Sequence, residues 1–578
     1  MIGMHSLSLR ASMSDTCNTV AVREANIIAD HSVGNLHNMT VSQKQRIVIL
    51  GGGFGGVYTA IYLEKKLKYR NDVEVILVSK ENYFVFQPML AEVVSGSIGI
   101  LDTVSPLRRL LPRTTLFIRD VEEINLEQKT VSLSPGFRPR QMILPYDHLV
   151  LALGTVTDFR GLPGLYEHAL PFKNLADAVA LRNHLIHVLE EASIEPDPET
   201  KKELLTFVIA GGGFSGVEVA AEMNDFLREV ATRYRGLSRD DIHVILLHSG
   251  ERILERELAP DLGEYAQNIL RKRGVDIRLK TRLRTASQNA AILQNGEIIP
   301  SKTVVSTVPS SPHPLIETLN LPKERGKLQV DQTLQIVGHP AVWALGDCAL
   351  VPYPGADKYC PPTAQHATRQ AELLAKNLLA SIDNKPRQTF QFTGLGKMGS
   401  LGHRSAVAEI IWGIKLSGIL AWFFWRTVYW WKLPGLDRKL RVGISWFIDL
   451  LLPADFVQLK LTEKNAIAQA HYEPGEMVFE QGDVGDCLYI LVKGEVEILV
   501  NQDGEQKVVA HLRQGEYFGE MALLKHQSRS ASVRCVTAVE LLMLRRGDFQ
   551  SLISNLADLR ASMESVMEKR LLTDPQEP

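Results

Sequence analysis

The fold of this chain is decided by the run Arg46-Ile47-Val48-Ile49-Leu50, which continues as Gly51-Gly52-Gly53-Phe54-Gly55-Gly56. The run Phe207-Val208-Ile209-Ala210 continues in the same way, as Gly211-Gly212-Gly213-Phe214-Ser215-Gly216. Each joins a short apolar strand to G-x-G-x-x-G, whose glycines turn tightly and let a pyrophosphate approach the N-terminus of the next helix. Two copies predict two bound dinucleotides, the usual equipment for hydride transfer between a nicotinamide and a flavin. The alternative is that one or both are plain glycine-rich turns.

The bulk composition is that of an ordinary globular protein. The chain has 578 residues, of which 45% are hydrophobic and 22% charged, and its net charge is −2. This length predicts three or four domains. The charge balance gives no global attraction to nucleic acid or anionic lipid, so we expect no nucleic-acid partner. The five cysteines are scattered without a C-x-x-C pair, which favours a reducing compartment and argues against a metal site.

Further apolar, strand-like segments indicate an α/β fold with two Rossmann-like domains. These segments are 73–78, 146–155, 242–247, 303–308 and 341–347. The last one returns to the first unit after the second glycine loop. We therefore predict an FAD-type domain split into 43–165 and 313–390, with a second nucleotide domain, 166–312, inserted between its parts. The polar, aperiodic segment 1–42 is predicted to be disordered.

Residues 391–458 are rich in tryptophan and in basic side chains. Six of the seven tryptophans lie between Trp412 and Trp446. The longest clean apolar run, Leu416 to Trp425, is too short to span a bilayer, which needs about 20 residues. Tryptophan beside lysine and arginine on an amphipathic helix suits the lipid headgroup layer, so we predict a membrane-surface anchor. A buried helical hairpin and a dimer interface remain as alternatives.

From residue 459 the sequence changes to short strands separated by glycine turns. The glycines are Gly475, Gly482, Gly494, Gly504, Gly515 and Gly519. This spacing predicts a small β-barrel or jelly roll in 459–578.

Between about residues 43 and 455 the chain resembles the type II (non-proton-pumping) NADH:quinone oxidoreductases, a flavoprotein family with two Rossmann-like domains. Besides the glycine loops, the likeness is carried by residues 81–90, the Leu-Gly-Thr turn at 153–155, the Gly346-Asp347 pair and residues 361–370. The A-Q-x-A pattern in the last stretch is the most specific. The aromatic segment from Gly418 onward resembles the family's C-terminal membrane anchor.

The resemblance assigns FAD to the first loop, with its diphosphate over Gly51 to Gly56. Asp347 would accept a hydrogen bond from hydroxyls of the flavin's sugar chain, although it could simply form a turn. Gly154, in the Leu-Gly-Thr turn, belongs to the same expected site. The ribose position holds Ser79, followed by Lys80, where a general fingerprint has Asp or Glu. A serine here also occurs within the family.

The resemblance assigns the nicotinamide nucleotide to the second loop, Gly211 to Gly216. The residues that follow match the family pattern G-V-E-x-A, so Glu218 would bind the nicotinamide ribose or orient the dihydronicotinamide. The alternative is a carboxylate that only complements the helix dipole. The strand-end position holds His248, with Arg252 nearby, where an acid would repel the extra phosphate of NADPH. We expect NADH, while NADPH or dual use stays open.

Electrons would pass from the nicotinamide to the flavin and then to a quinone. We expect Gln365, with Ala364, to hydrogen-bond the quinone near the flavin ring, and the alternative is a glutamine that caps backbone groups. His366 is expected to be a structural neighbour. Sulfide:quinone oxidoreductases use two cysteines beside the flavin, and here Cys360 has no partner in 156–165. Disulfide reductase and sulfide chemistry are therefore disfavoured.

The far end resembles the phosphate-binding cassette of cyclic-nucleotide-binding domains. The run Phe518-Gly519-Glu520 is followed by Arg529-Ser530-Ala531 at the family spacing, with Ser528 in place of a common proline. Glu520 would accept from the ribose 2′-hydroxyl and Arg529 would pair with the cyclic phosphate, with contacts from Gly519 and Ser530. The alternative is a domain that kept its shape and lost its ligand.

These observations lead to one preferred function. We expect a flavoenzyme, peripheral on the cytoplasmic face of the cell (inner) membrane, that carries electrons from NADH to a quinone. Its terminal domain would respond to cAMP or cGMP, and a homodimer stays open. The alternatives are a soluble NAD(P)H oxidoreductase with another acceptor and a non-catalytic redox or cyclic-nucleotide sensor.

Overall fold

The computed structural model describes residues 44–136, 142–157, 159, 164–307, 310–410, 413–453, 455–459, 467–485, 487–502, 505–525, 528–555 and 565. The segment 1–42, which the sequence predicts to be disordered, lies outside the described residues, and so does Trp412. The described chain contains two parallel sheets, which confirms the α/β prediction, and a pair of antiparallel sheets near its C-terminus.

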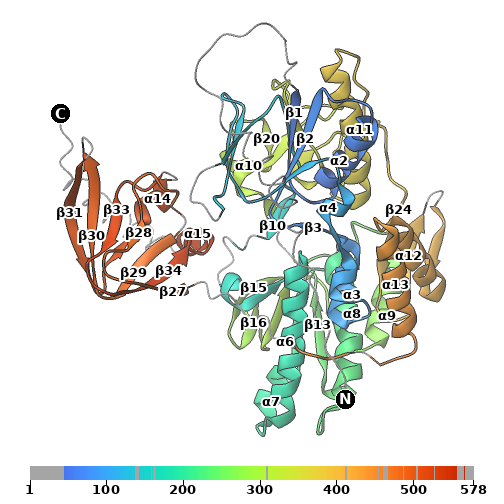
Figure 1. Cartoon of the computed structure of the whole chain (residues 1–578). Coiled ribbons are helices and arrows are strands. Elements are labelled where there is room, and N and C mark those ends of the chain that lie inside the picture. The colour runs from blue at the N-terminus through green and yellow to red at the C-terminus, as the bar shows by residue number, and fades with distance from the viewer. Residues whose placement is uncertain are drawn as a thin grey trace, which may run out of the picture. The chain divides into compact units, whose positions relative to one another are not determined.

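A five-stranded parallel sheet forms around the first glycine loop (Figure 1). Its strand order is β22 (Val342–Ala344), β9 (His148–Leu151), β1 (Gln45–Leu50), β2 (Val73–Ser79) and β5 (Thr115–Ile118). The central strand β1 is buried from Ile47 to Leu50, as expected for an unbroken apolar run inside a parallel sheet. Strand β22 pairs in parallel with β9, so the chain returns to this sheet after it has built the second one.

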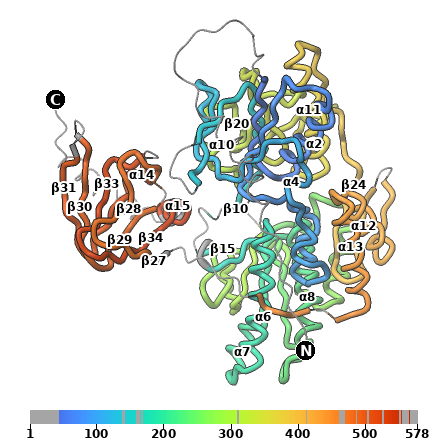
Figure 2. Tube along the Cα trace, viewed as in Figure 1, coloured from blue at the N-terminus to red at the C-terminus, as the bar shows by residue number. Residues whose placement is uncertain are grey.

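Helices cover this first sheet. α2 (Phe54–Lys66) begins inside the glycine loop and packs on α11 (Ala364–Ile382). The two helices lie side by side in both views (Figure 1; Figure 2). This pairing brings the N-terminal end of α11, which carries the A-Q-x-A pattern, into the first nucleotide-binding unit.

The second parallel sheet repeats the plan around the second glycine loop. Its order is β11 (Ala169–Pro171), β18 (Thr303–Ser306), β12 (Thr206–Ala210), β13 (His243–Leu247) and β14 (Val275–Arg278). The helices around it are α6 (Leu175–Ile194), α8 (Phe214–Ala231) and α9 (Pro260–Lys272). A capping box between Asn174 and Asp177 starts α6, which satisfies two of the free N–H groups at that end.

Smaller sheets complete the part of the chain that precedes the C-terminal pair of sheets. They are β3 (Tyr83–Val85) with β4 (Val104–Pro106); β6 (Val121–Asn125), β7 (Thr130–Leu133) and β8 (Met142–Pro145); β10 (Thr155–Thr157) with β19 (Ser310–Pro312); β15 (Leu283–Ser287), β16 (Ala290–Leu293) and β17 (Ile298–Pro300); and β20 (Lys323–Glu324), β21 (Lys327–Gln329) and β23 (Ala349–Leu350). A last one, β24 (Gly396–Ser400), β25 (Ala406–Ile410) and β26 (Lys415–Ser417), leads into a helical hairpin.

That hairpin consists of α12 (Gly418–Lys432) and α13 (Leu436–Asp449). Trp422, Trp425 and Trp446 are buried in it, whereas Trp431 is exposed. The buried-hairpin alternative therefore describes these three tryptophans. Among the described residues, no helix combines the length and apolar character needed to cross a bilayer.

The C-terminal portion is built from two four-stranded antiparallel sheets, which confirms the expected β architecture. One contains β27 (Ile467–Tyr472), β34 (Val539–Arg545), β29 (Cys487–Lys493) and β32 (Tyr517–Phe518). The other contains β28 (Met477–Phe479), β33 (Ser532–Cys535), β30 (Glu495–Gln502) and β31 (Glu505–Arg513). The short helix α14 (Glu520–Lys525) carries the start of the cassette, and α15 (Arg546–Asn555) follows β34.

Candidate functional site

The first glycine loop is packed against backbone at two positions and open at a third. Gly51 has a φ of +117°, and a Cβ there would overlap the Ala152 carbonyl oxygen. A Cβ at Gly56 would overlap the Gly51 carbonyl oxygen, whereas one at Gly53 would meet no atom of the chain within 4 Å. The opening at Gly53 is the place where this type of turn admits a pyrophosphate, so the loop fits the diphosphate of FAD.

This loop forms one wall of a cavity of about 280 Å³. The polar residues that line the cavity include Ser79, Lys80, Glu81, Arg119 and His313. The Ser79 hydroxyl donates to the Glu81 carbonyl (2.8 Å). The sequence did not single out Glu81, although an acid two positions after Ser79 was the available signal. Arg119 and His313 carried no such signal, because only the fold brings them to this loop.

Asp347 follows strand β22, and two lysines act on its carboxyl. Burial raises the pKa of Asp347, while the charges of Lys173 and Lys327 lower it. The Lys173 ammonium also donates to the Thr155 hydroxyl, one residue after Gly154, which has a φ of +66°. Asp347, Lys173 and the Leu-Gly-Thr turn therefore form one polar cluster. Sequence reasoning missed Lys173, which belongs to no recognisable motif.

The second loop has the same tight turn as the first, but at Gly213 a Cβ would lie 3.1 Å from the Glu257 carboxylate, whereas the matching Gly53 is open. Gly211 has a φ of +123°, and a Cβ at Gly216 would overlap its carbonyl oxygen. The Phe214 ring lies so close to Gly399 that a Cβ there would come within 2.6 Å of it. The start of α8 is therefore packed against strand β24.

Glu218 lies in the first turns of α8, at this junction. Its Oε1 accepts the Ser400 backbone N–H (3.0 Å). Burial, opposed by the Ser400 N–H and assisted by the charges of the Glu222 and Glu92 carboxyls, raises the pKa of Glu218 to about 8. A carboxyl with this pKa holds a proton for much of the time at neutral pH, which suits proton exchange with a bound reactant.

Two further carboxyls, those of Glu222 and Glu92, are buried close enough to act on Glu218. Burial raises the pKa of Glu222 to about 8 and that of Glu92 to about 7. Glu92 accepts from Arg426 (3.3 Å) and from the Trp446 indole (3.1 Å), and Arg426 also donates to Asp449 (3.2 Å). The hairpin thus supplies the cation and the indole that satisfy an acid of α3 (Leu90–Ser95).

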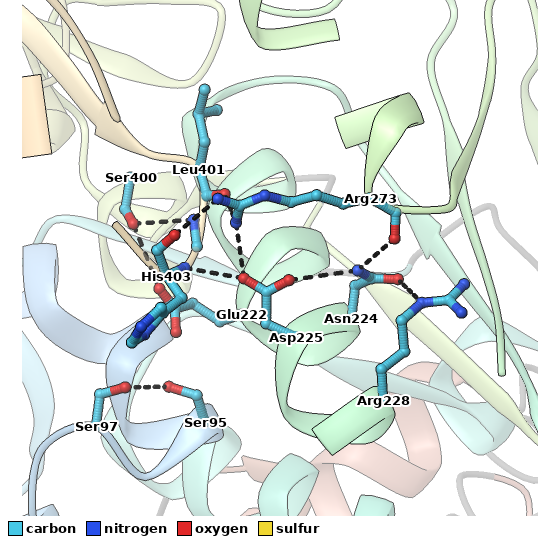
Figure 3. Close-up of polar contacts among 11 residues, drawn as sticks. Ser95, Ser97, Glu222, Asn224, Asp225, Arg228, Arg273, Ser400, Leu401 and His403 are labelled. Atoms are coloured by element: carbon cyan, nitrogen blue, oxygen red, sulfur yellow. Dashed lines mark hydrogen bonds and ion pairs between the residues drawn. The ribbon is translucent and has the colours of Figure 1, made fainter. Parts of the chain in front are cut away.

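Polar residues of α8 fix the segment that follows β24 (Figure 3). Ser400 donates to Glu222 (3.3 Å), and the His403 N–H donates to Asp225 (2.9 Å). Arg273 binds Asp225 (2.8 Å) together with the carbonyls of Leu401 (2.8 Å) and His403 (2.7 Å). These bonds hold the Ser400 N–H in place under the Glu218 carboxylate.

The A-Q-x-A residues lie at the N-terminal end of α11. The Gln365 amide donates to the Gly396 carbonyl (3.0 Å) and accepts the Leu395 N–H (3.0 Å). It therefore caps backbone groups at the start of β24, as the alternative expected. His366 contacts the Thr363 hydroxyl (2.7 Å) and is buried. The quinone role of Gln365 and Ala364 stays a prediction.

In the terminal domain the cassette residues converge. Glu520 and Arg529 are both buried, whereas Ser530 is exposed. Arg529 donates to the carbonyls of Gly519 and Cys487 (2.8 Å each), and its guanidinium lies 4.1 Å from the centre of the Phe479 ring. The structure brings the arginine to the glycine of the cassette, and the nucleotide contacts of Glu520, Arg529, Gly519 and Ser530 stay predictions.

Comparison with known proteins agrees with this geometry. Residues 45–371 match the pyridine nucleotide-disulphide oxidoreductase family, and residues 395–453 match the NDH2 C-terminal domain. The chain is 33% identical to the demethylphylloquinone reductase of Synechocystis sp., over 70% of this chain and 96% of that protein. It is 30% identical to a type II NADH:quinone oxidoreductase of Mycobacterium tuberculosis, over 75% and 93%. The chain belongs to the type II NADH:quinone oxidoreductases.

The solved structures support the same architecture. The NDH2 of Plasmodium falciparum in complex with NADH superposes with a TM-score of 0.66 at 19% identity, over 72% of this chain and 100% of that one. The sulfide:quinone oxidoreductase of Aquifex aeolicus has a TM-score of 0.55 at 18% identity. At such identities the likeness shows the fold alone.

Membership of the family implies FAD and NADH as cofactors. Burial raises the pKa of the Cys360 thiol to about 11. The terminal portion has a relationship of its own, since residues 469–555 match the cyclic nucleotide-binding domain. This oxidoreductase therefore carries a second, separate ligand-binding fold.

Proposed function

We propose that this enzyme passes electrons from NADH to a quinone at a membrane surface without pumping protons, and that a cyclic nucleotide at its terminal domain tunes the reaction. The observation that carries the proposal is the junction at Glu218. There the nicotinamide loop meets strand β24 through the Ser400 N–H. When bound, FAD accepts a hydride and gives two electrons to the quinone. The cell (inner) membrane, on its cytoplasmic face, is the proposed location.

The chain's own residues position the reactants and hold protons. The glycine loops would bind the two diphosphates, and Asp347 with Lys173 would hold the sugar chain of the flavin. Glu218 holds a proton on its free carboxylate oxygen, because its Oε1 is occupied by the Ser400 N–H. That proton is available to the quinone, whose reduction to a quinol consumes two protons and two electrons.

Turnover of FAD-loaded protein with NADH and a short-chain quinone tests the enzyme. We expect Glu218→Gln to lower kcat about tenfold or more while the flavin content stays unchanged. Glu199→Gln, on an exposed position of α7 (Pro198–Leu204), is the matched control. Absence of turnover in the wild type would favour the sensor alternative. Turnover with soluble dyes but not with quinones would favour the soluble-reductase alternative.

The hairpin supports the membrane location. On α13 and just beyond it, Leu440, Ile444, Phe447 and Leu451 are each more than half exposed. Their spacing of three or four residues places them on one face. Arg441 is exposed on the same helix. Apolar side chains beside basic ones are typical of helices that lie in the headgroup layer.

The terminal domain supports cyclic-nucleotide binding through the buried pair Glu520 and Arg529 at the family spacing. Calorimetry with cAMP and with cGMP tests it. We expect one of the two to bind, and Arg529→Lys to weaken that binding about tenfold or more, because lysine loses the bidentate fit to phosphate. Lysine keeps a buried cation near the Gly519 carbonyl. No binding by a folded wild type would mean that the domain has lost its ligand.

A short segment before the terminal domain supports the regulatory part of the proposal. Residues 455–459, which we call the strap, lie along α6. The Asn183 side chain donates to the Leu459 carbonyl and accepts its N–H (2.9 Å each), and Arg182 donates to the Asp455 carbonyl. Arg182 also donates to the Val94 carbonyl of α3 (2.9 Å), the helix that carries Glu92. A movement of the strap would therefore reach the acids behind Glu218.

A further inference from the structure

The position that normally distinguishes NADH from NADPH carries no acid in this chain. Strand β13 ends at Leu247, and the next residue in this fold usually offers a carboxylate to the adenosine ribose 2′-hydroxyl. Here that residue is His248, whose ring packs on the second glycine loop, so that a Cβ at Gly212 would overlap it. The histidine therefore fills the strand-end position without supplying a carboxylate.

The carboxylate of Glu255, seven residues after His248, lies beside the end of strand β13. Glu255 Oε2 accepts the Glu251 N–H (3.1 Å), and Oε1 lies 3.8 Å from His248 Nε2. A Cβ on Gly250 would overlap the same carboxylate. Glu255 therefore lies over residues 248–251, the first residues after the strand end.

The backbone between them adopts an unusual conformation that makes this return possible. Leu254 has a φ of +55°, in a region that a bulky side chain rarely occupies. Its side chain is fully buried, and its N–H donates to the Gly212 carbonyl (2.8 Å). The turn is thus fixed to the nucleotide loop itself, and it directs Glu255 back over the strand end.

His248 and Glu255 differ in their access to solvent. His248 Nε2 is covered and has no hydrogen-bond partner, whereas the Glu255 side chain keeps 30% exposure. The group that faces an incoming ribose is therefore the carboxylate. His248 lies beneath it as a positioning residue.

Two cations near this place, Arg252 and Lys280, already have partners elsewhere. Arg252 donates to the Leu258 carbonyl (3.3 Å) and packs against Gly263 of α9. Lys280 pairs with Glu251 (2.8 Å). A ribose 2′-phosphate, which carries between one and two negative charges, would meet carboxylates here.

We propose that Glu255 selects NADH over NADPH, by accepting a hydrogen bond from the adenosine ribose 2′-hydroxyl and repelling a 2′-phosphate. The proposal rests on NADH binding at the second glycine loop. It assigns the selecting role to a residue outside the strand-end position where the fold usually places it.

The test compares Glu255→Gln with the wild type in two measurements. One is kcat/KM for NADH and for NADPH with a short-chain quinone, and the other is the Kd of NAD⁺ and of NADP⁺ by calorimetry. Glutamine still accepts the Glu251 N–H, so the loop keeps its support. Glu199→Gln, at an exposed position of α7 outside this site, loses the same charge and is the matched control.

We expect the wild type to prefer NADH and NAD⁺ by about 100-fold or more, and Glu255→Gln to narrow both ratios about tenfold. Glu199→Gln should leave both ratios within about twofold of the wild type, since an exposed charge outside the site is screened. The proposal is overturned if the Glu255→Gln ratios equal those of the wild type, or if the wild type uses both nucleotides equally. A wild type without NADH turnover would instead contradict the proposed function itself.

Discussion

Glu222 is buried on α8, one helical turn after Glu218, and its protonation links stability to pH. Burial raises the pKa of Glu222 from 4.5 to about 8, so the folded protein keeps a proton that the unfolded chain releases. The folded state then binds more protons than the unfolded state between these two values, and the free energy of unfolding falls as the pH rises through that window.

Glu222→Gln should remove this part of the pH dependence. Glutamine is neutral and its carbonyl still accepts from Ser400. As the pH rises from 5 to 8, we expect the free energy of unfolding of the variant to increase relative to that of the wild type by up to about 1.4 kcal/mol for each pH unit. Urea unfolding across that range measures the difference. An equal slope in both proteins would show that Glu222 is already ionised in the folded state, and Glu199→Gln should not change the slope.

Among single residues, the sequence predicts a role for Glu218, which belongs to a motif, but it does not predict the buried residues packed around Glu218. Glu218 was singled out through G-V-E-x-A. Glu92 and Arg426 are 334 positions apart, and nothing in their local sequence shows that they meet. Burial, which determines the pKa of these acids, is a property of the packed fold. Glu255 could not be predicted for the same reason, because its approach to His248 depends on the backbone turn at Leu254.

At the scale of the element, the first glycine loop separates two roles that a motif treats alike. A Cβ at Gly56 would collide with the loop's own backbone, whereas a Cβ at Gly53 would point into open space. The φ of Gly53 is −85°, which alanine adopts freely. One glycine is therefore required by the fold of the loop, and the other is required by the ligand.

Gly53→Ala should keep the stability of the flavin-free protein within about 1 kcal/mol of the wild type, because the conformation is unstrained. It should nevertheless lose most of the bound flavin, since the methyl group fills the space for the diphosphate. Gly56→Ala should lower the unfolding free energy by about 2 kcal/mol or more. Flavin absorbance and urea unfolding measure the two effects. Normal FAD loading by Gly53→Ala would contradict this assignment of the site.

The hairpin shows what the composition of an element leaves undecided. The unbroken apolar run of β1 predicted a buried strand correctly, because a strand without polar residues needs cover on both faces of its sheet. The tryptophans of α12 and α13 favoured a lipid interface, yet Trp425 packs against Tyr429 and Trp446 inside the protein. Aromatic and basic composition is the same for a buried hairpin and for a surface one. Only the fold shows which side chains face outward.

The outward face of α13 gives a prediction for the membrane. Replacing Ile444 and Phe447 with serine removes two apolar side chains that are 59% and 63% exposed. We expect flotation with vesicles that contain phosphatidylglycerol to fall about fivefold or more. Ile194→Ser, at a 76% exposed position of α6, removes an exposed isoleucine elsewhere and should float like the wild type. Equal loss in both would contradict docking through the hairpin.

At the scale of the whole molecule, the enzyme and the terminal domain are separate folds in one chain. Seven residues, 460–466, separate the strap from β27 in the sequence. The strap has no periodicity, so its docking on α6 could not be predicted from the sequence. Its contacts reach α3 through Arg182, whose guanidinium also lies 5.0 Å from the centre of the Phe226 ring of α8. Arg182 therefore contacts the strap, α3 and α8, and the last two are the helices that carry the buried acids.

If the strap transmits the signal, Asn183→Ala should separate binding from regulation. It removes both bonds to Leu459 and leaves the terminal domain untouched. We expect the nucleotide identified by calorimetry to bind as in the wild type, while its effect on NADH turnover falls by half or more. Asn174→Ala is the control, because it removes the cap of the same helix at a cost of about 1 kcal/mol without touching the strap. A full response in both variants would mean that coupling takes another route, and no response in the wild type would contradict regulation altogether. A reduced response confined to Asn183→Ala would show that the two hydrogen bonds between Asn183 and Leu459 connect the terminal domain to the buried acids near the nicotinamide loop.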